Sequence, residues 1–248
     1  MNKVALITGG SRGIGAATAL LAASQGWTVA INYLRHAHAA EAIAQKIRDA
    51  GGVALTIQAD VSVEADVITM FETIDHELGP LGALVNNAGV VDHASRVDQM
   101  LGERLRRMFS INVLGSFYCA REAVRRMSTR YGGAGGSIVN VSSAAARLGS
   151  PHEYVDYAAS KGALDVLTIG LAKEVAGEGI RVNSVRPGVI DTEIHASGGR
   201  PNRLDEITPG VPMGRGGTPE EVAQSIVWLM SDASPFTTMS FLEISGGR

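Results

Sequence analysis

A tyrosine and a lysine spaced four residues apart, Tyr157 and Lys161 in the segment YAASK, are suited to proton transfer. Positions four apart lie on one face of a helix, so the phenol and the ammonium can converge. A free tyrosine has a pKa of about 10, and lowering it to about 7 takes about 4 kcal/mol, which a nearby cation can supply. In isolation such a pair is usually an ordinary solvated feature, so its meaning depends on the rest of the chain.

Two consecutive serines, Ser142 and Ser143, end the apolar run SIVNVSS upstream of this pair. Side chains alternate along a strand, so only one of the two hydroxyls can face the same site as Tyr157. We expect Ser143 to be that residue, with Ser142 as the alternative.

A glycine-rich turn follows the first apolar run of the chain. In TGGSRGIG the residues Gly9, Gly13 and Gly15 lie where a strand passes into a helix. Glycines let the backbone approach a pyrophosphate, and the N-terminus of the helix supplies amide donors and the positive end of its dipole. This position, after the first strand of a βα series, predicts a dinucleotide-binding site.

The residues after the second apolar run bear on the choice between NAD and NADP. An acid that binds the ribose hydroxyls of NAD usually lies there, but the stretch from Asn32 to His36, which includes Tyr33 and Arg35, has none. Arg12 and Arg35 are available to pair with a 2′-phosphate. The sequence therefore favours NADP(H).

Short apolar runs alternate with longer segments of helical period along the chain. The expected strands are VALIT, TVAIN, VALTI, ALVNN, SIVNVSS, RVNSVRP and a last one near 240–244, and the expected helices cover 16–24, 39–50, 64–77, 98–127, 155–176 and 219–231. Strands alternating with helices indicate βαβ units and a parallel sheet, and the lack of polar alternation in the strands indicates helices on both faces. With no linker or repeat, we interpret residues 1–248 as one domain.

The segment 192–217 interrupts this rhythm with glycines and prolines, among them Gly198, Gly199, Pro201, Pro209, Gly210, Pro212, Gly214 and Gly216. A long irregular segment in a compact domain is often functional, and we expect a substrate lid. Its polar residues indicate either a polar substrate or simply the polarity of a surface loop; they are His195, Arg200, Arg203, Asp205 and Glu206.

The composition of the chain limits the classes of molecule that it is expected to bind. The 248 residues carry a formal net charge of −3 and are 45% hydrophobic, which gives no long-range attraction to nucleic acid or to an acidic membrane. No apolar run reaches the length of a membrane span, a single cysteine excludes an internal disulfide, and the six histidines show no metal-ligand spacing. We expect a small-molecule substrate, no metal, and a cytoplasmic location.

Taken in order, several motifs resemble the short-chain dehydrogenase/reductase family. They are TGGSRGIG, Asp60 in ADV, NNAG at 86–89, Asn112 in INVLG, Ser143 in NVSS, YAASK, and RPG at 186–188. The resemblance is nearest to NADPH-dependent reductases of the 3-oxoacyl-carrier-protein reductase type and to glucose-type sugar dehydrogenases. It implies a doubly wound Rossmann-type fold with a seven-stranded parallel sheet, and hydride transfer between the nicotinamide and a carbonyl or secondary alcohol.

The resemblance also implies roles for individual residues. Tyr157 would act as general acid in reduction or as base in oxidation, and Lys161 would bind the nicotinamide ribose and lower the pKa of Tyr157. Ser143 would orient the carbonyl, and Asn112 would position, through its backbone, a water that connects Lys161 with solvent. The implied cofactor contacts are Gly9, Ser11, Arg12, Gly13, Ile14, Gly15, Tyr33, Arg35, Asp60, Val61, Asn86, Ala88, Gly89, Tyr157, Lys161, Pro187, Gly188, Val189 and Thr192.

Two departures from the family pattern and two alternative functions stand beside this interpretation. Ser143 lies 14 residues before Tyr157, about one more than is usual, which lengthens the loop before Tyr157. Residues 237–240 and Ser245 depart from the usual C-terminal pattern, which bears on assembly. Family members commonly form homotetramers or homodimers through the helices expected at 98–127 and 155–176. The alternatives are a sugar dehydrogenase and a non-catalytic NADP-binding regulator.

Overall fold

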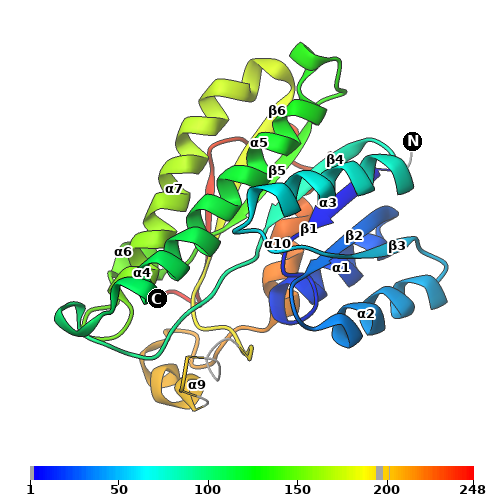
Figure 1. The fold of residues 1–248 in the computed structure, drawn as a ribbon. Helices are drawn as coiled ribbons and strands as arrows, with labels where there is room; N and C mark the ends of the chain where they lie inside the picture. The colour runs from blue at the N-terminus through cyan, green and yellow to red at the C-terminus, as the bar shows by residue number, and fades with distance from the viewer. Residues whose placement is uncertain (1–2, 194–197, 201) are drawn as a thin grey trace.

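The computed structural model describes residues 3–193, 198–200 and 202–248. In these residues one seven-stranded sheet runs through the molecule, with the strand order β3-β2-β1-β4-β5-β6-β7 and every pair of neighbours parallel (Figure 1). The strands are β1 (Lys3–Ile7), β2 (Trp27–Tyr33), β3 (Ala54–Gln58), β4 (Leu81–Asn86), β5 (Gly136–Val141), β6 (Ile180–Pro187) and β7 (Phe241–Ile244). The doubly wound α/β fold predicted from the alternating pattern is confirmed.

Helices cover both faces of the sheet. The described helices are α1 (Gly13–Ser24), α2 (Ala37–Asp49), α3 (Glu64–Glu77), α4 (Gly102–Phe109), α5 (Gly115–Met127), α6 (Ala145–Leu148), α7 (Val155–Val175), α9 (Arg203–Ile207) and α10 (Pro219–Met230). One buried apolar cluster joins α1, α2 and α10 to the sheet, and a second joins α3, α5 and α7 to the opposite face. Two apolar layers explain why the strand sequences lack a polar alternation.

The chain order creates a crevice at the carboxyl ends of β1 and β4. After β1 the chain winds outward through β2 and β3, and it then returns to add β4 on the other side of β1. The connections leaving β1 and β4 therefore diverge. Ligands of open α/β sheets bind at such a switch point, and here the glycine-rich turn and the NNAG segment meet there.

The helix expected over 98–127 is divided. A 3₁₀ turn spans Val97–Gln99, α4 begins at Gly102, and a π turn at Ser110–Leu114 separates α4 from α5. The π turn contains Asn112, whose side-chain amide exchanges two hydrogen bonds with the backbone of Val90, at 2.8 and 3.0 Å. A π turn inside an α-helix is frequently found at a functional site.

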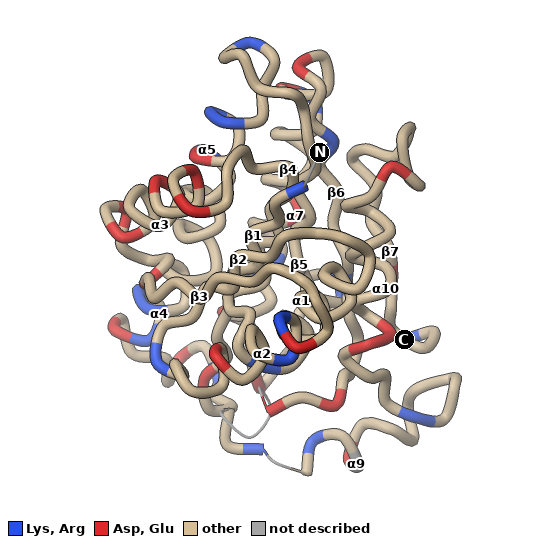
Figure 2. Tube along the Cα trace, turned by 90° about the vertical axis from the view of Figure 1, so that its right-hand side faces the viewer, with Lys and Arg blue, Asp and Glu red and all other residues tan. Residues whose placement is uncertain are grey.

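Charged side chains of both signs are interspersed along the chain (Figure 2). This mixture of signs agrees with the small formal net charge of −3. None of the described helices has the length and apolar character needed to cross a membrane.

Candidate active site

A cavity of about 620 Å³ lies at the carboxyl ends of the strands. Its walls come from the turns after β1 to β6, from the start of α7, and from α4 and α9. This volume is within the range of small-molecule and cofactor sites, roughly 300–1,000 Å³. Most of the cofactor contacts implied by the sequence line it: Gly9, Ser11, Arg12, Gly13, Ile14, Tyr33, Arg35, Asp60, Val61, Ala88, Gly89, Tyr157, Lys161, Pro187, Gly188, Val189 and Thr192.

The turn after β1 has a backbone that depends on glycine. Gly9 has φ +62° and Gly13 has φ +53°, in the left-handed region that other residues rarely adopt. A Cβ on Gly15 would lie 2.5 Å from the carbonyl oxygen of Gly9, so this residue packs the turn against α1 and does not line the cavity. The turn thus leaves a backbone surface beside the N-terminus of α1, which fits a pyrophosphate.

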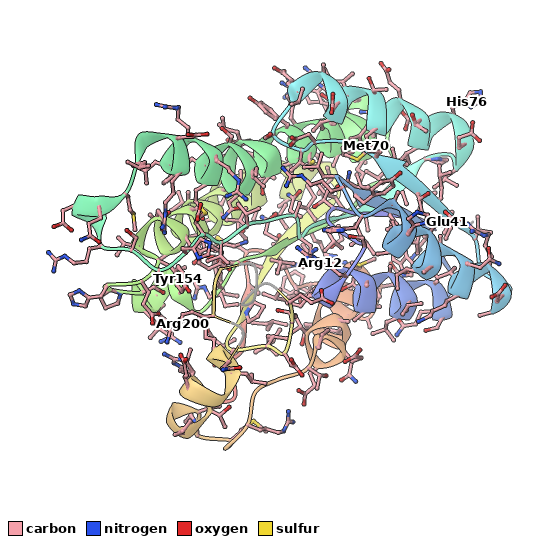
Figure 3. The ribbon with its side chains drawn as sticks, turned by 60° about the horizontal axis from the view of Figure 1, so that its bottom comes forward. Arg12, Glu41, Met70, His76, Tyr154 and Arg200 are labelled. Carbon is pink, nitrogen blue, oxygen red and sulfur yellow. The ribbon has the colours of Figure 1, made fainter. Side chains whose placement is uncertain are left out.

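Near the end of β2 lies a buried asparagine whose hydrogen bonds stabilise the fold. Asn32 is buried, its Oδ1 accepts from the Gly9 amide at 3.2 Å, and its Nδ2 donates to the Ala59 carbonyl at 3.0 Å. Asn32 therefore connects β2 to the glycine-rich turn. The residues that follow it on the cavity wall include Tyr33 and Arg35, and the cavity is also lined by Arg12, which is labelled in Figure 3 just before α1.

The two asparagines of the NNAG segment lie in different environments. The sequence singled out Asn86, but this side chain is buried, bonds Asn140 at 2.9 Å, and does not line the cavity. Asn87 does line it, and its Nδ2 donates to the carbonyls of Thr8 and Gly9 at 2.9 and 3.1 Å. Sequence reasoning missed Asn87, although the alternation of side chains along β4 separates the two residues.

Tyr157, Lys161 and Ser143 come together on one wall of the cavity. Lys161 Nζ lies 5.6 Å from the centroid of the Tyr157 ring and donates to the Val141 carbonyl at 2.7 Å. The Ser143 hydroxyl hydrogen-bonds the Tyr157 phenol and accepts from the Ala145 amide at 3.1 Å. Three segments distant in sequence thus place a phenol, an ammonium and a hydroxyl together.

The two serines differ as alternation predicts. Ser142 is buried, and its Oγ donates to the backbone carbonyl of Lys161 at 3.2 Å, whereas Ser143 contacts Tyr157. Ser142 therefore fixes α7 against β5, and the geometry favours Ser143 as the residue beside the reacting group.

Burial dominates the electrostatics of this cluster. It raises the pKa of Tyr157, and the hydrogen bond with Ser143 acts in the opposite direction. It also lowers the pKa of Lys161 to about 8, against the attraction of Asp165. The expected lowering of the tyrosine pKa is thus not found: Tyr157 is a protonated phenol at neutral pH.

Asn112 lies behind the cavity wall and not on it. It is fully buried, and its Nδ2 also donates to Ser160 Oγ at 3.0 Å. Through these bonds and those to Val90 it joins the π turn, α7 and the segment after β4. Nearby, Arg104 from α4 donates to both carboxylate oxygens of Asp156, the residue before Tyr157, at 2.7 and 3.0 Å.

The segment expected to be a lid supplies part of the opposite wall. Thr192, Arg203 and Ile207 line the cavity, and Glu193 lies 3.9 Å from Arg12 as an ion pair. Arg200 and Arg203 both bind Glu153 in the loop before Tyr157. His195 lies outside the described residues, as does the side chain of Asp205.

The described residues hold no group of three or more His, Cys, Asp or Glu side chains that could bind a metal ion. The polar groups on the cavity wall are instead hydrogen-bond donors and cations, together with Asp60, Asp92 and Glu193. That donor set fits an anionic dinucleotide, because backbone amides and arginines bind phosphate.

Known proteins share this fold and much of this sequence. The family model described as enoyl-(acyl carrier protein) reductase matches residues 9–248. An uncharacterised oxidoreductase of Escherichia coli is 58% identical over 99% of both chains. A cis-4-hydroxycyclohexanecarboxylate dehydrogenase of Sinomonas cyclohexanicum is 37% identical over 99% of this chain and 96% of its own. The crystal structure of a short-chain type dehydrogenase/reductase from Mycobacterium marinum superposes with a TM-score of 0.92 at 37% identity, covering 99% of this chain and 94% of that one.

Proposed function

Because the chain belongs to the short-chain dehydrogenase/reductase family and is an oxidoreductase of that family, we propose that it reduces a ketone to a secondary alcohol, or catalyses the reverse, with NADP(H). The observation that carries the proposal is the meeting of Ser143, Tyr157 and Lys161 on one cavity wall. When bound, the nicotinamide cofactor supplies or accepts the hydride. The residues of the chain bind and orient the cofactor and the substrate, and they transfer the proton.

Each catalytic residue has one task in this proposal. The Ser143 hydroxyl donates a hydrogen bond to the substrate carbonyl oxygen and holds it beside Tyr157. The Tyr157 phenol gives its proton to that oxygen as it becomes an alkoxide, and takes the proton back in the oxidative direction. A buried phenol whose pKa is raised is protonated at neutral pH, which is the form that gives a proton in the reductive direction.

Lys161 and Asn112 support these steps. The Lys161 ammonium would bind the nicotinamide ribose hydroxyls and would stabilise the tyrosinate after proton transfer. Asn112 would act through its neighbours, because its side chain fixes the backbone at Val90 and the hydroxyl of Ser160. The water that its backbone was expected to hold stays a prediction.

The preference for NADP(H) rests on the side chains after β2 and at the start of α1. Arg12 and Arg35 line the cavity, and residues 32–36, where a ribose-binding acid would repel a 2′-phosphate, contain no acid. The exposed guanidinium groups can turn toward a phosphate. Cofactor contacts from Asp60, Ala88, Pro187 and Thr192 belong to the same proposal.

Two alternatives differ from this function in ways that can be measured. A non-catalytic NADP-binding regulator would need the glycine-rich turn and Lys161 but neither Ser143 nor Tyr157, so an intact trio supports an enzyme. A sugar dehydrogenase would use the same trio on glucose. The Sinomonas relative is named as the dehydrogenase of a secondary alcohol carried on a ring. That name supports an alcohol and ketone substrate without excluding a sugar.

The remaining parts of the proposal concern architecture. We propose that residues 1–248 act as one domain, that 192–217 closes over the substrate, and that the chain works as a homotetramer or homodimer in the cytoplasm. Exposed apolar side chains on α5 and α7, Phe117, Val166 and Ile169, support association through these helices.

A panel of ketones, a 3-oxoacyl thioester and glucose would test the function. NADPH consumption with a ketone or thioester that disappears in Tyr157→Phe supports a reductase. NADP reduction with glucose supports the sugar dehydrogenase. Tight NADPH binding without turnover of any substrate supports the regulator.

A further inference from the structure

Arg203 presents an unused hydrogen-bond donor at the edge of the cavity. Its Nη2 donates to Glu153 Oε2 at 2.7 Å, and its guanidinium carbon lies 4.8 Å from the centroid of the Tyr154 ring. Its Nη1 is buried and has no hydrogen-bond partner among the described residues. A buried donor without an acceptor costs about 1–3 kcal/mol, more for a charged group, so an acceptor is expected there.

The loop before Tyr157 holds this guanidinium in place. Gly149 has φ +75°, and two residues that are not glycine, Ser150 and His152, have φ +44° and +65°. Such conformations persist where the surrounding structure enforces them, and they cluster at functional sites. The loop buries Tyr154 and turns Glu153 toward the arginine. The added residue noted in the sequence thus falls in the loop that positions Arg203.

Arg200 differs from Arg203 in a way that separates anchoring from ligand binding. Both bind Glu153, and Arg200 also binds Glu206. Arg200 does not line the cavity, whereas Arg203 does. Both nitrogens of Arg200 that form ion pairs are satisfied.

The charge of the cavity agrees with an anionic ligand. Six of its lining side chains are Arg or Lys and three are Asp or Glu, although the whole chain carries −3. Arg12 and Arg35 lie at the end assigned to the cofactor. Of the other four, Arg107 is paired with Asp92, Arg248 is the last residue of the sequence, and Lys161 lies at the reacting group. Arg203 is paired with Glu153 through Nη2 but keeps Nη1 without a hydrogen-bond partner among the described residues.

We propose that Arg203 determines specificity by binding a carboxylate of the substrate whose carbonyl lies at Ser143 and Tyr157, so that the substrates are keto acids and the corresponding hydroxy acids. This inference rests on the proposed function. The carboxylate accepts a hydrogen bond from Nη1, which a small displacement of the side chains enclosing it makes accessible. Arginine suits the role because its planar fork can bind Glu153 and a second carboxylate at once.

Matched acids and esters test the proposal. Pyruvate, acetoacetate and levulinate, each beside its methyl ester, would be assayed with NADPH, because the three place the carboxylate at increasing distances from the ketone. We expect the wild-type protein to have a lower KM for at least one acid than for its ester. Arg203→Gln should raise the KM of that acid by roughly tenfold to hundredfold, the loss of one charge-assisted hydrogen bond, and leave the ester within about twofold.

Two further variants separate ligand binding from anchoring. Arg203→Lys keeps the charge and should recover part of the preference for the acid. Arg200→Ala removes the other arginine on Glu153 and should leave the ratio of acid KM to ester KM unchanged. A merely structural role for Arg203 would change the acid and the ester equally, and that result overturns the proposal.

The role proposed for Arg203 and the proposed function are contradicted by different results. If neither acid nor ester is reduced, the affinity of the NADPH complex for each compound, measured by calorimetry, still decides the role of Arg203, and the proposed function alone is lost. If Arg203→Gln does not fold, the wild-type protein decides: equal binding of every acid and its ester overturns the proposal.

Discussion

Asp165 lies one helical turn beyond Lys161 on α7, and it raises the pKa of the Lys161 ammonium against the lowering caused by burial, which leaves that pKa at about 8. Its Oδ2 accepts two hydrogen bonds from Arg186, at 3.0 and 2.9 Å, while its Oδ1 is buried and has no hydrogen-bond partner among the described residues. Asp165 thus connects the lysine of the site with the strand that leads to Pro187 and Gly188.

This relationship predicts a shift in pH dependence. A lysine that must be protonated works below its pKa and fails as the pH rises through it. Asp165→Asn removes the favourable charge, so the pKa of Lys161 falls below about 8 and the alkaline decline of kcat/KM moves to lower pH. The pH profile of kcat/KM and of NADPH affinity measures the shift. Glu243→Gln, which removes the other partner of Arg186, is the control; a decline at the wild-type pH in Asp165→Asn contradicts the prediction.

Tyr157→Phe should separate proton transfer from cofactor binding. The ring and its packing stay, but no proton can be given to the carbonyl oxygen, so we expect kcat to fall by roughly 10²–10⁴ with nearly unchanged NADPH affinity. Lys161→Ala should weaken both. Steady-state kinetics and fluorescence titration with NADPH measure these effects, and a Tyr157→Phe protein that keeps most of its kcat excludes the mechanism.

The two serines provide a matched pair. Ser143→Ala removes the hydroxyl that contacts Tyr157 and should lower kcat by roughly 10²-fold or more, in the range of a lost oxyanion donor. Ser142→Ala removes a bond to the Lys161 backbone and should change thermal stability more than kcat. Equal losses of kcat in the two variants would contradict the assignment of Ser143.

Cofactor preference should depend on two arginines. We expect Arg12→Ala and Arg35→Ala each to reduce the preference for NADPH over NADH by about tenfold, because a hydrogen bond to a charged group contributes about 1.5–3 kcal/mol. KM values for both cofactors give the ratio. Arg48→Ala, a change at a half-buried arginine of α2 that pairs with Glu41 and does not line the cavity, serves as control. An unchanged ratio in both variants would remove the basis for NADP(H).

Association should depend on the exposed apolar side chains of α5 and α7. Val166 is 68% exposed in the single chain, and Val166→Glu would place a charge in the proposed interface, beside Phe117 and Ile169. Light scattering after size exclusion should show a smaller assembly. Val53→Glu, at an exposed valine elsewhere, should leave the mass unchanged, and a monomeric wild-type protein would exclude this interface.

Periodicity predicted the fold well because each strand is buried on both faces and each helix has an apolar face toward the sheet. The expected helix 64–77 coincides with α3, and the expected 155–176 differs from α7 by one residue. The segment 98–127 was predicted less well. Its division depends on hydrogen bonds between Asn112 and Val90, which are distant in sequence, and helical periodicity carries no information about such partners.

The parts of the site that depend on backbone motifs could be predicted from the sequence. The parts that depend on whether a side chain is buried or faces the cavity could be predicted less well. That only one of the two consecutive serines faces Tyr157 followed from strand alternation. The placement of Asn86 behind the cavity, the direction of the Tyr157 pKa and the role proposed for Arg203 follow from burial, which only the packed structure determines.

The π turn at 110–114 amounts to one residue inserted into a helix that would otherwise run from α4 into α5. A π turn takes up an extra residue within a single wide turn, so the helices on either side keep nearly the phase of an unbroken helix. Arg104 therefore still faces Asp156, the neighbour of Tyr157. A chain without the extra residue could keep this ion pair, but it would lose the wide turn that holds Asn112 against Val90.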